Sequence, residues 1–244
     1  MRSFIFEYKK VLMANNLRKA IKEAFGYEID EFDRRFNRYL RKKYFPVLLE
    51  KKSPDDYGTE IADRKRRDIP TVSPSISPSG ELIAALSAPS MELDLVVVSA
   101  EDGALVRNLT KGWTNKYENL ITEAYGGKRD LTWSPAGDQI AVFVKKENRR
   151  PLVLFDALTG KRLRTYDLGD LYETASPAFT PDGSAIAFEG NLRGVVDLFE
   201  LDLESGDVRN LTEDDFFDTN PWYSADGATL LYNRRIGEHW KIFQ

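Results

Sequence analysis

The residues that could do chemistry in this chain are few and scattered. The one histidine, His239, lies five residues from the end, and the sequence contains no cysteine. Zinc sites and catalytic dyads need imidazole, thiolate or carboxylate groups brought together inside the fold. HExxH, G-x-S-x-G, P-loop and G-x-G-x-x-G motifs are all absent. We therefore expect no catalytic residue, no metal ligand and no cofactor, and we interpret His239 as an ordinary strand residue.

Carboxylates are numerous but dispersed. The four that fall in or beside predicted strands are Asp94, Asp156, Asp197 and Asp202. Aspartate accepts hydrogen bonds from nearby backbone N–H groups in turns, and charged side chains protect strand edges. We favour these structural roles over metal binding.

Aromatic residues are the better binding candidates. They are Trp113, Tyr117, Trp133, Trp222 and Tyr223. The first two lie in an insertion at residues 111–130, and inserted loops on a rigid scaffold often carry binding residues. The alternative is a longer connector whose aromatic rings pack against neighbouring strands, and this alternative is the favoured one.

A repeated segment positions these candidates. Four copies share a Ser or Thr, a turn ending in glycine, and an apolar strand: ISPSGELIAAL (76–86), WSPAGDQIAVF (133–143), FTPDGSAIAFE (179–189) and YSADGATLLYN (223–233). Their glycines are Gly80, Gly137, Gly183 and Gly227, at spacings of 57, 46 and 44 residues. The long first spacing is explained by the insertion.

A second marker keeps the same register. Gly103, Gly160 and Gly206 repeat the spacings of 57 and 46 residues, and RNLT occurs at both 107–110 and 209–212. Glycine turns between short apolar runs are hairpin signals. The runs LIAAL, IAVFV, AIAFE and TLLYN have the composition of inner strands, and each unit has room for four antiparallel strands. Such a blade buries both faces only by stacking on its neighbours.

These marks resemble the WD40-like repeat of TolB, which is also found in tricorn-type and prolyl-oligopeptidase-type propellers. TPDG at 180–183, SADG at 224–227 and the closing RNLT carry the resemblance, which covers residues 71–244. It implies a mainly β fold, a partial β-propeller of about four four-stranded blades. The last blade is incomplete, because the sequence stops in its third strand. TolB-like propellers usually have six blades, so we expect a fragment of a longer protein.

The N-terminal region differs in charge and pattern. Residues 1–67 contain 18 lysines and arginines against 11 acidic residues, whereas the remainder contains 17 against 28. Helical spacing predicts a small helical segment over 1–45, with Gly26 capping one helix and Pro46 ending the next. Residues 46–70 are predicted to be a linker. A basic amphipathic helix could contact anionic membrane or nucleic acid, but we favour a helix face packed on a domain.

Residues 20–44 resemble the closing helices of peptidase-MA-like (gluzincin) domains, which precede TolB-like propellers in some bacterial proteins. The resemblance implies an upstream zinc peptidase in the parent protein. No HExxH motif is present here, so no metal ligand or catalytic residue is carried over.

Three functions remain open. The first is a non-catalytic scaffold that binds a protein or peptide, and the second is a propeller that gates substrate for a peptidase domain elsewhere. Carbohydrate binding by the exposed aromatics is the third and weakest. We expect no nucleic-acid partner and no transmembrane segment. No signal peptide is recognisable, and periplasmic or exported localisation rests on the resemblance alone.

Overall fold

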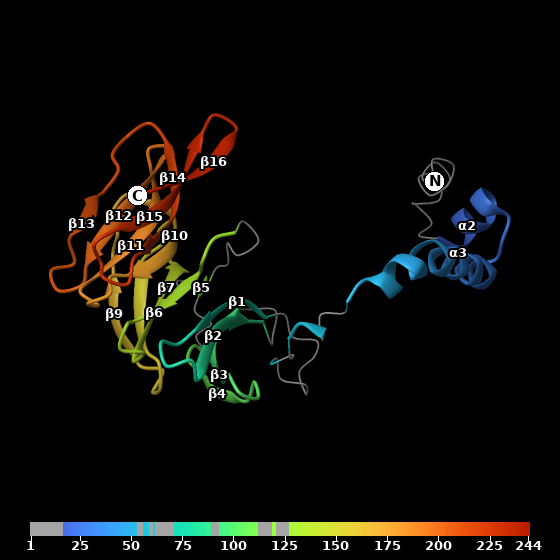
Figure 1. Cartoon of the computed structure of the whole chain (residues 1–244), viewed down its shortest axis with the longest axis horizontal. Helices are drawn as coiled ribbons and strands as arrows, with labels where there is room; N and C mark the ends of the chain where they lie inside the picture. Colours follow the sequence, from blue (N-terminus) through green and yellow to red (C-terminus); the bar gives the residue numbers. More distant parts are fainter. Residues whose placement is uncertain are drawn as a thin grey trace. The chain divides into compact units, whose positions relative to one another are not determined.

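The computed structural model describes residues 17–52, 56–58, 61, 71–88, 93–111, 119–120 and 127–244. The chain divides into two compact units, Met1–Glu60 and Ile61–Gln244 (Figure 1). The first contains helices and the second contains strands.

The helical unit is built on α2 (Leu17–Phe25) and α3 (Ile29–Glu50). Gly26 lies between them at φ +76°, and its N–H donates to the Lys22 carbonyl at 2.9 Å, as expected of a C-terminal cap. Ala20 and Ile21 are buried, and the rings of Phe25 and Phe32 lie 4.8 Å apart. These contacts hold α2 against the start of α3.

The predicted helix end at Pro46 is wrong, because α3 continues through Pro46 to Glu50. Proline removes one backbone N–H and crowds the preceding turn, but the helix can continue when the hydrogen bonds on either side persist. No α3 residue is buried, and Phe36, Tyr39 and Tyr44 are exposed. The packing of this face on a domain stays a prediction. Among the described helices, none is long and apolar enough to cross a bilayer.

Four sheets form the second unit, in chain order. The first is β1 (Thr71–Ile76), β2 (Leu82–Ser87), β3 (Asp94–Ser99) and β4 (Leu105–Asn108). The second is β6 (Leu131–Trp133), β7 (Gln139–Lys145), β8 (Leu152–Asp156) and β9 (Arg162–Tyr166), with β5 (Asn119–Leu120) added on β7. The third is β10 (Tyr172–Phe179), β11 (Ala185–Leu192), β12 (Val195–Asp202) and β13 (Val208–Asn210). The fourth is β14 (Phe217–Tyr223), β15 (Leu230–Ile236) and β16 (His239–Phe243).

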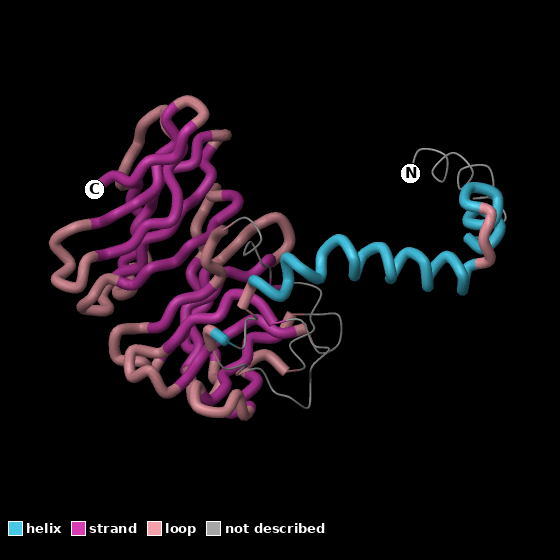
Figure 2. The backbone as a smooth tube through the Cα atoms, turned by 45° about the vertical axis from the view of Figure 1, so that its right-hand side comes forward, coloured by secondary structure: helices cyan, strands magenta, loops and turns pink. Residues whose placement is uncertain are grey.

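The sheets are antiparallel blades whose order in space follows the sequence (Figure 1). Figure 2 shows only strands and connecting loops throughout residues 127–244. The first strands of successive blades contact one another, since β6 contacts both β1 and β10, and β10 contacts β14. The inner edge is therefore formed by β1, β6, β10 and β14. The apolar runs predicted as inner strands are β2, β7, β11 and β15, one position further out.

The partial propeller predicted from the repeat is confirmed, including the three-stranded last blade. The insertion contributes β5, which pairs with β7 beyond the point where β6 ends. Its remaining residues, 112–118 and 121–126, lie outside the described part of the chain.

The side chains of β7 alternate between two cores, and the strand thereby links three blades. Ile140, Val142 and Val144 are buried in a core shared with the first blade, whereas Ala141 and Phe143 are buried in a core shared with the third. Successive strand residues point to opposite faces, so one strand can supply both cores. The stacking expected from the repeat is therefore the main source of burial.

The repeated glycine turns pack against each other between blades. A Cβ placed on Gly183 would lie 3.6 Å from the Pro135 ring in the preceding turn, and Gly227 has the same relation to Pro181 at 3.5 Å. Both glycines have positive φ, at 76° and 71°. The Pro-x-Gly spacing thus serves a turn and an inter-blade contact at once.

Aspartates in the turns make the fold sensitive to acid. Hydrogen bonds from the backbone N–H and hydroxyl of neighbouring turn residues hold the pKa of Asp182 below its ordinary value of 3.8, at about 2. The same cause lowers the pKa of Asp102, Asp156, Asp202 and Asp226. A lowered folded-state pKa contributes stability that is present above the unfolded value and lost as the pH falls through the folded value.

We therefore predict that the free energy of unfolding falls as the pH drops from about 4 to about 2. Urea titrations at a series of pH values measure this slope. Asp182→Asn keeps an acceptor for the turn but cannot titrate, so its slope is expected to be shallower. The control Glu204→Gln changes an exposed acid that caps no turn. An equal slope in Asp182→Asn and the wild-type chain would contradict the prediction.

Candidate binding groove on the inner strands

Three of the five predicted binding residues meet at one hollow. Trp133, Trp222 and Tyr223 line a groove of about 310 Å³ at the end of the inner strands. The other lining residues are Thr132, Pro135, Ala178, Phe179, Pro181, Ser224 and Ala225. Trp113 and Tyr117 lie outside the described residues, so their predicted role stays a prediction.

The groove is built from equivalent positions of three blades. Trp133, Phe179 and Tyr223 each end an inner strand, and each is followed by the Ser or Thr that opens the turn. The repeat therefore places aromatic side chains side by side as the blades stack. The strands supply a rigid wall for the groove.

Trp133 is buried, and its polar group is engaged within the protein. Its side chain is only 6% exposed, and its indole Nε1 donates to the Ser75 carbonyl of the first blade at 2.9 Å. It ties two blades together and forms part of the groove floor.

Tyr223 is fixed by a carboxylate. Its hydroxyl donates to Glu200 Oε2 on β12 at 2.5 Å, while Arg209 donates to the other oxygen of Glu200 at 2.7 Å. Burial, followed by the Glu200 contact, raises the pKa of Tyr223 above its ordinary value of 10. The phenol stays neutral, and its ring is held against the groove.

Trp222 is the one of the three that remains open to solvent, at 54% exposure. The Arg129 guanidinium lies over its ring, 4.7 Å from the centroid. Arg129 also donates to the carbonyls of Ser176, at 3.4 Å, and Pro221. Burial lowers the pKa of Arg129 to about 10, so the group is still charged at neutral pH. These contacts hold the exposed ring in place.

The sequence predictions did not include a ring of polar residues behind this groove. Equivalent positions of the four blades carry Ser73, Asp130, Ser176 and Asn220. Ser73 donates to Asp130, and Ser176 donates to the Asn220 side-chain oxygen at 2.8 Å. In the sequence, three of these four positions could have been recognised because a proline follows the serine or asparagine shortly before the glycine turn. All three residues before proline have positive φ, at irregularities of strand pairing.

Glu189 on β11 bonds to this ring of polar residues, and it too was not predicted from the sequence. Its side chain has no solvent exposure, lies 2.6 Å from Lys128 Nζ, and accepts from the Asn220 N–H at 3.0 Å. The contact fixes the part of β14 that leads to Trp222. In the sequence Glu189 was only the last residue of an apolar run.

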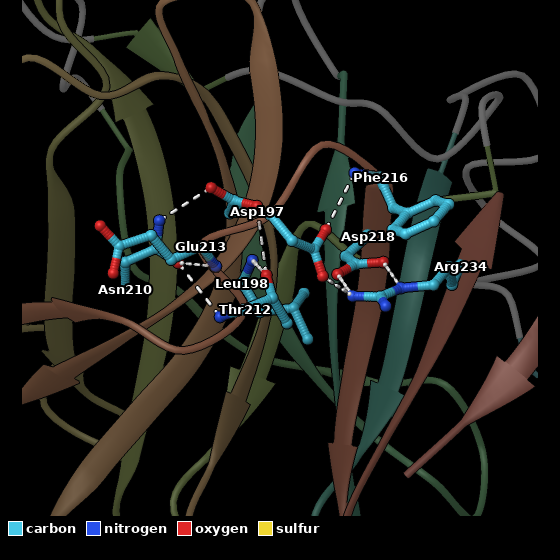
Figure 3. A network of polar contacts seen from close by, with 9 residues as sticks. Asp197, Leu198, Asn210, Thr212, Glu213, Phe216, Asp218 and Arg234 are labelled. Carbon is cyan, nitrogen blue, oxygen red and sulfur yellow. Dashed lines mark hydrogen bonds and ion pairs between the residues drawn. The ribbon is translucent and has the colours of Figure 1, made fainter.

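A cluster of three carboxylates on the third and fourth blades has the spacing of a cation site. Oxygen atoms of Asp197, Asp214 and Asp218 lie within 4.8 Å of one another. Arg234 occupies the position of the cation, with 2.6 Å to Asp218 and 2.5 Å to Asp214 (Figure 3). Hydrogen bonding to Asp218 raises the pKa of Arg234 still further. Arg234 pairs with two of the three carboxylates, and Asp197 is bonded to Asn210 and Thr212 instead. The place of a metal ion is therefore taken by a guanidinium.

The repeated RNLT segment is a clamp between the outer strands of a blade. Asp197 accepts from Asn210 at 2.8 Å and from Thr212 at 3.2 Å, while the Leu198 N–H donates to Thr212 at 3.1 Å (Figure 3). The first blade repeats this with Asp94, Asn108 and Thr110. Asp156 and Asp202 instead accept turn N–H groups. The predicted turn-capping role is thus observed for Asp156 and Asp202, whereas Asp94 and Asp197 bond the neighbouring strand, a contact that was not predicted.

His239 lies at the start of β16 and is exposed, as expected of a strand residue. It does not line the groove. None of the groove-lining residues is a carboxylic acid, histidine or lysine, so the hollow has no pair of groups for general acid–base chemistry.

Comparison with solved structures shows which known proteins the blades resemble. A putative TolB from Agrobacterium tumefaciens matches with a TM-score of 0.56 and 17% identity, over 70% of this chain and 59% of that one. TolB from Acinetobacter baumannii matches with a TM-score of 0.56 and 20% identity, over 71% of this chain and 40% of that one. The blades have the TolB-type propeller fold. The chain spans about half the length of these two TolB structures.

TolB-type blades also occur in hydrolases. A puromycin hydrolase S511A mutant complexed with PGG matches with a TM-score of 0.53 and 18% identity, over 78% of this chain and 29% of that one. No family model matches the chain. The resemblance of residues 20–44 to a peptidase-MA-like domain therefore stays a prediction.

Proposed function

We propose that the TolB-type blades are a non-catalytic scaffold that binds a protein or peptide partner in the groove around Trp222. The observation that carries this proposal is an exposed tryptophan held by Arg129 at the mouth of an apolar groove. Binding energy in protein interfaces concentrates on such preordered aromatic side chains. A groove of about 310 Å³ accepts a few side chains rather than a whole domain.

The chemistry of the lining supports binding over catalysis. The polar atoms of Trp133 and Tyr223 are already engaged within the protein. The hydroxyl of Ser224 donates to Asp226 at 2.6 Å, and no histidine or lysine lies beside it in the groove. Such a lining also favours a peptide over a carbohydrate, because sugars need several free hydrogen-bonding groups.

A second candidate function is that of a propeller which gates substrate for a peptidase domain. The similarity to the propeller region of puromycin hydrolase favours it. The same groove would then contact substrate peptides rather than a stable partner. A peptidase domain encoded beside these blades in the parent protein would favour this alternative. By resemblance to TolB-like proteins we also propose a periplasmic or exported location.

Selection from a random peptide display library tests the proposal. Enriched peptides are expected to bind the wild-type chain and to lose about 10-fold to 30-fold in affinity for Trp222→Ala, the effect of removing an interface hot spot. The matched control is Trp240→Ala, which removes an equally exposed tryptophan, 53% against 54%, from β16 of the same blade. The proposal fails if enriched peptides bind Trp222→Ala as well as the wild-type chain, or if glycans alone bind.

A further inference from the structure

The rim of the groove is negatively charged. The turns beside it carry three exposed aspartates, Asp138, Asp182 and Asp226. Asp182 and Asp226 lie within the turns and directly follow Pro181 and Ala225 of the groove lining, and Asp138 comes directly after the turn that contains Pro135. The charges of Asp182 and Asp226 therefore lie next to residues that line the groove.

These aspartates are not neutralised by partners within the described chain. Asp138 and Asp226 accept from serine hydroxyls, and Asp182 accepts from the N–H and hydroxyl of Ser184. Hydrogen bonds of this kind leave the negative charge in place. Of the neighbouring cations, Arg209 is paired with Glu200, whereas Arg129 bonds backbone carbonyls and the Trp222 ring and keeps its positive charge.

The groove itself offers aromatic faces and little hydrogen bonding. The Trp222 indole N–H has no partner within the described residues, whereas the polar groups of Trp133 and Tyr223 are occupied. An ordinary peptide would bury backbone N–H donors against this wall without acceptors, which is costly. Proline has no N–H, and its ring packs on aromatic faces. A polyproline II segment also presents carbonyl oxygens that one indole donor can bind.

We propose that the groove takes an extended, proline-containing peptide segment flanked by lysine or arginine residues. This rests on the proposed function and names the class of partner. The prolines lie against Trp222 and the aromatic floor, with one peptide carbonyl accepting from the Trp222 indole N–H. The basic side chains lie near Asp182 and Asp226 on the rim.

The test uses fluorescein-labelled peptides and the full chain in fluorescence anisotropy. The probe is a 12-residue peptide with a central Pro-Leu-Pro-Pro segment and two arginines on each side. One comparison peptide replaces the prolines with alanine, and another replaces the arginines with glutamate. We expect the probe to bind about 10-fold more tightly than either comparison peptide. We also expect its affinity to fall as salt rises, since exposed charges are screened.

Variants of the chain locate the contacts. Trp222→Ala is expected to weaken probe binding about 10-fold, and Asp182→Asn with Asp226→Asn about 5-fold to 10-fold, with a smaller salt dependence. Glu101→Gln with Glu204→Gln removes the same charge from exposed turns elsewhere and is expected to leave binding unchanged. Trp240→Ala is the matching aromatic control.

Two results would overturn the inference. One is equal binding of the three peptides; the other is equal binding of the probe to the rim variant and the wild-type chain. If library-selected peptides bind through Trp222 but contain neither prolines nor basic residues, this inference fails and the proposed function stands. If no peptide binding depends on Trp222, both fail.

Discussion

Replacing Arg234 with alanine is expected to lower the free energy of unfolding by about 3–5 kcal/mol, the usual cost of leaving a buried charge unpaired. Asp218 has no solvent exposure, and Arg234 bonds it through Nε at 2.7 Å and Nη2 at 2.6 Å. The guanidinium side chain is itself 13% exposed. Without it, the Asp218 carboxylate would remain in the interior beside Asp214 and Asp197 and would lose the ion-pair partner that the described residues provide.

Chemical denaturation of the wild-type chain and variants measures this effect. Arg235→Ala is the matched control, because Arg235 is exposed and bonds only the Gly237 carbonyl, at 3.1 Å. Its change is expected to stay within about 0.5 kcal/mol. Asp218→Asn in the Arg234→Ala background removes the stranded charge and is expected to recover part of the loss, so the two substitutions are not additive.

Melting temperatures measured with EDTA or Ca²⁺ distinguish a structural cluster of carboxylates from a cation site. Because Arg234 takes the place of a cation between Asp214 and Asp218, neither EDTA nor added Ca²⁺ is expected to shift the melting temperature of the wild-type chain. A loss below about 1 kcal/mol in Arg234→Ala would contradict the buried-pair account. A rise in wild-type melting temperature with Ca²⁺ would show that the carboxylates bind metal.

Replacing Phe188 with alanine is expected to cost about 3–5 kcal/mol through loss of burial and formation of a cavity. Phe188 has no solvent exposure and lies in the core shared by the second and third blades. Its ring packs 5.6 Å from Phe143 on β7 and 5.9 Å from Phe199 on β12. Removing the ring takes away contacts within one blade and between two.

Thermal and urea unfolding measure the loss. Phe188→Leu keeps most of the volume and is expected to cost less than about half as much, whereas Tyr172→Ala, at the exposed first residue of β10, is expected to change little. If stability comes from stacking, Phe188→Ala also loosens two of the three blades that line the groove, and probe binding weakens with it. A loss below about 1.5 kcal/mol would show that the blades do not depend on this shared core.

The features that the sequence predicted are local ones. Gly80, Gly183 and Gly206 were predicted as turn residues, and all three have positive φ. A hairpin turn is decided by a few neighbouring residues, so its sequence carries the signal. The same reason explains why the sequence also predicted the apolar strand runs, the three-stranded last blade and the turn-capping aspartates. The error at Pro46 arose because proline weakens a helix without necessarily ending it.

The features that needed the tertiary structure depend on residues far apart in the chain. Nothing in the sequence pairs Arg234 with Asp218, Lys128 with Glu189, or Arg129 with Trp222. The repeat placed three aromatic residues at equivalent positions, but only stacking of the blades showed that Trp133 is buried while Trp222 stays exposed. Local pattern fixes which way a side chain points from its strand, whereas the neighbouring blade decides whether that direction meets protein or solvent. The blades were therefore determined by the sequence alone, and the groove between them was decided by how those blades stack.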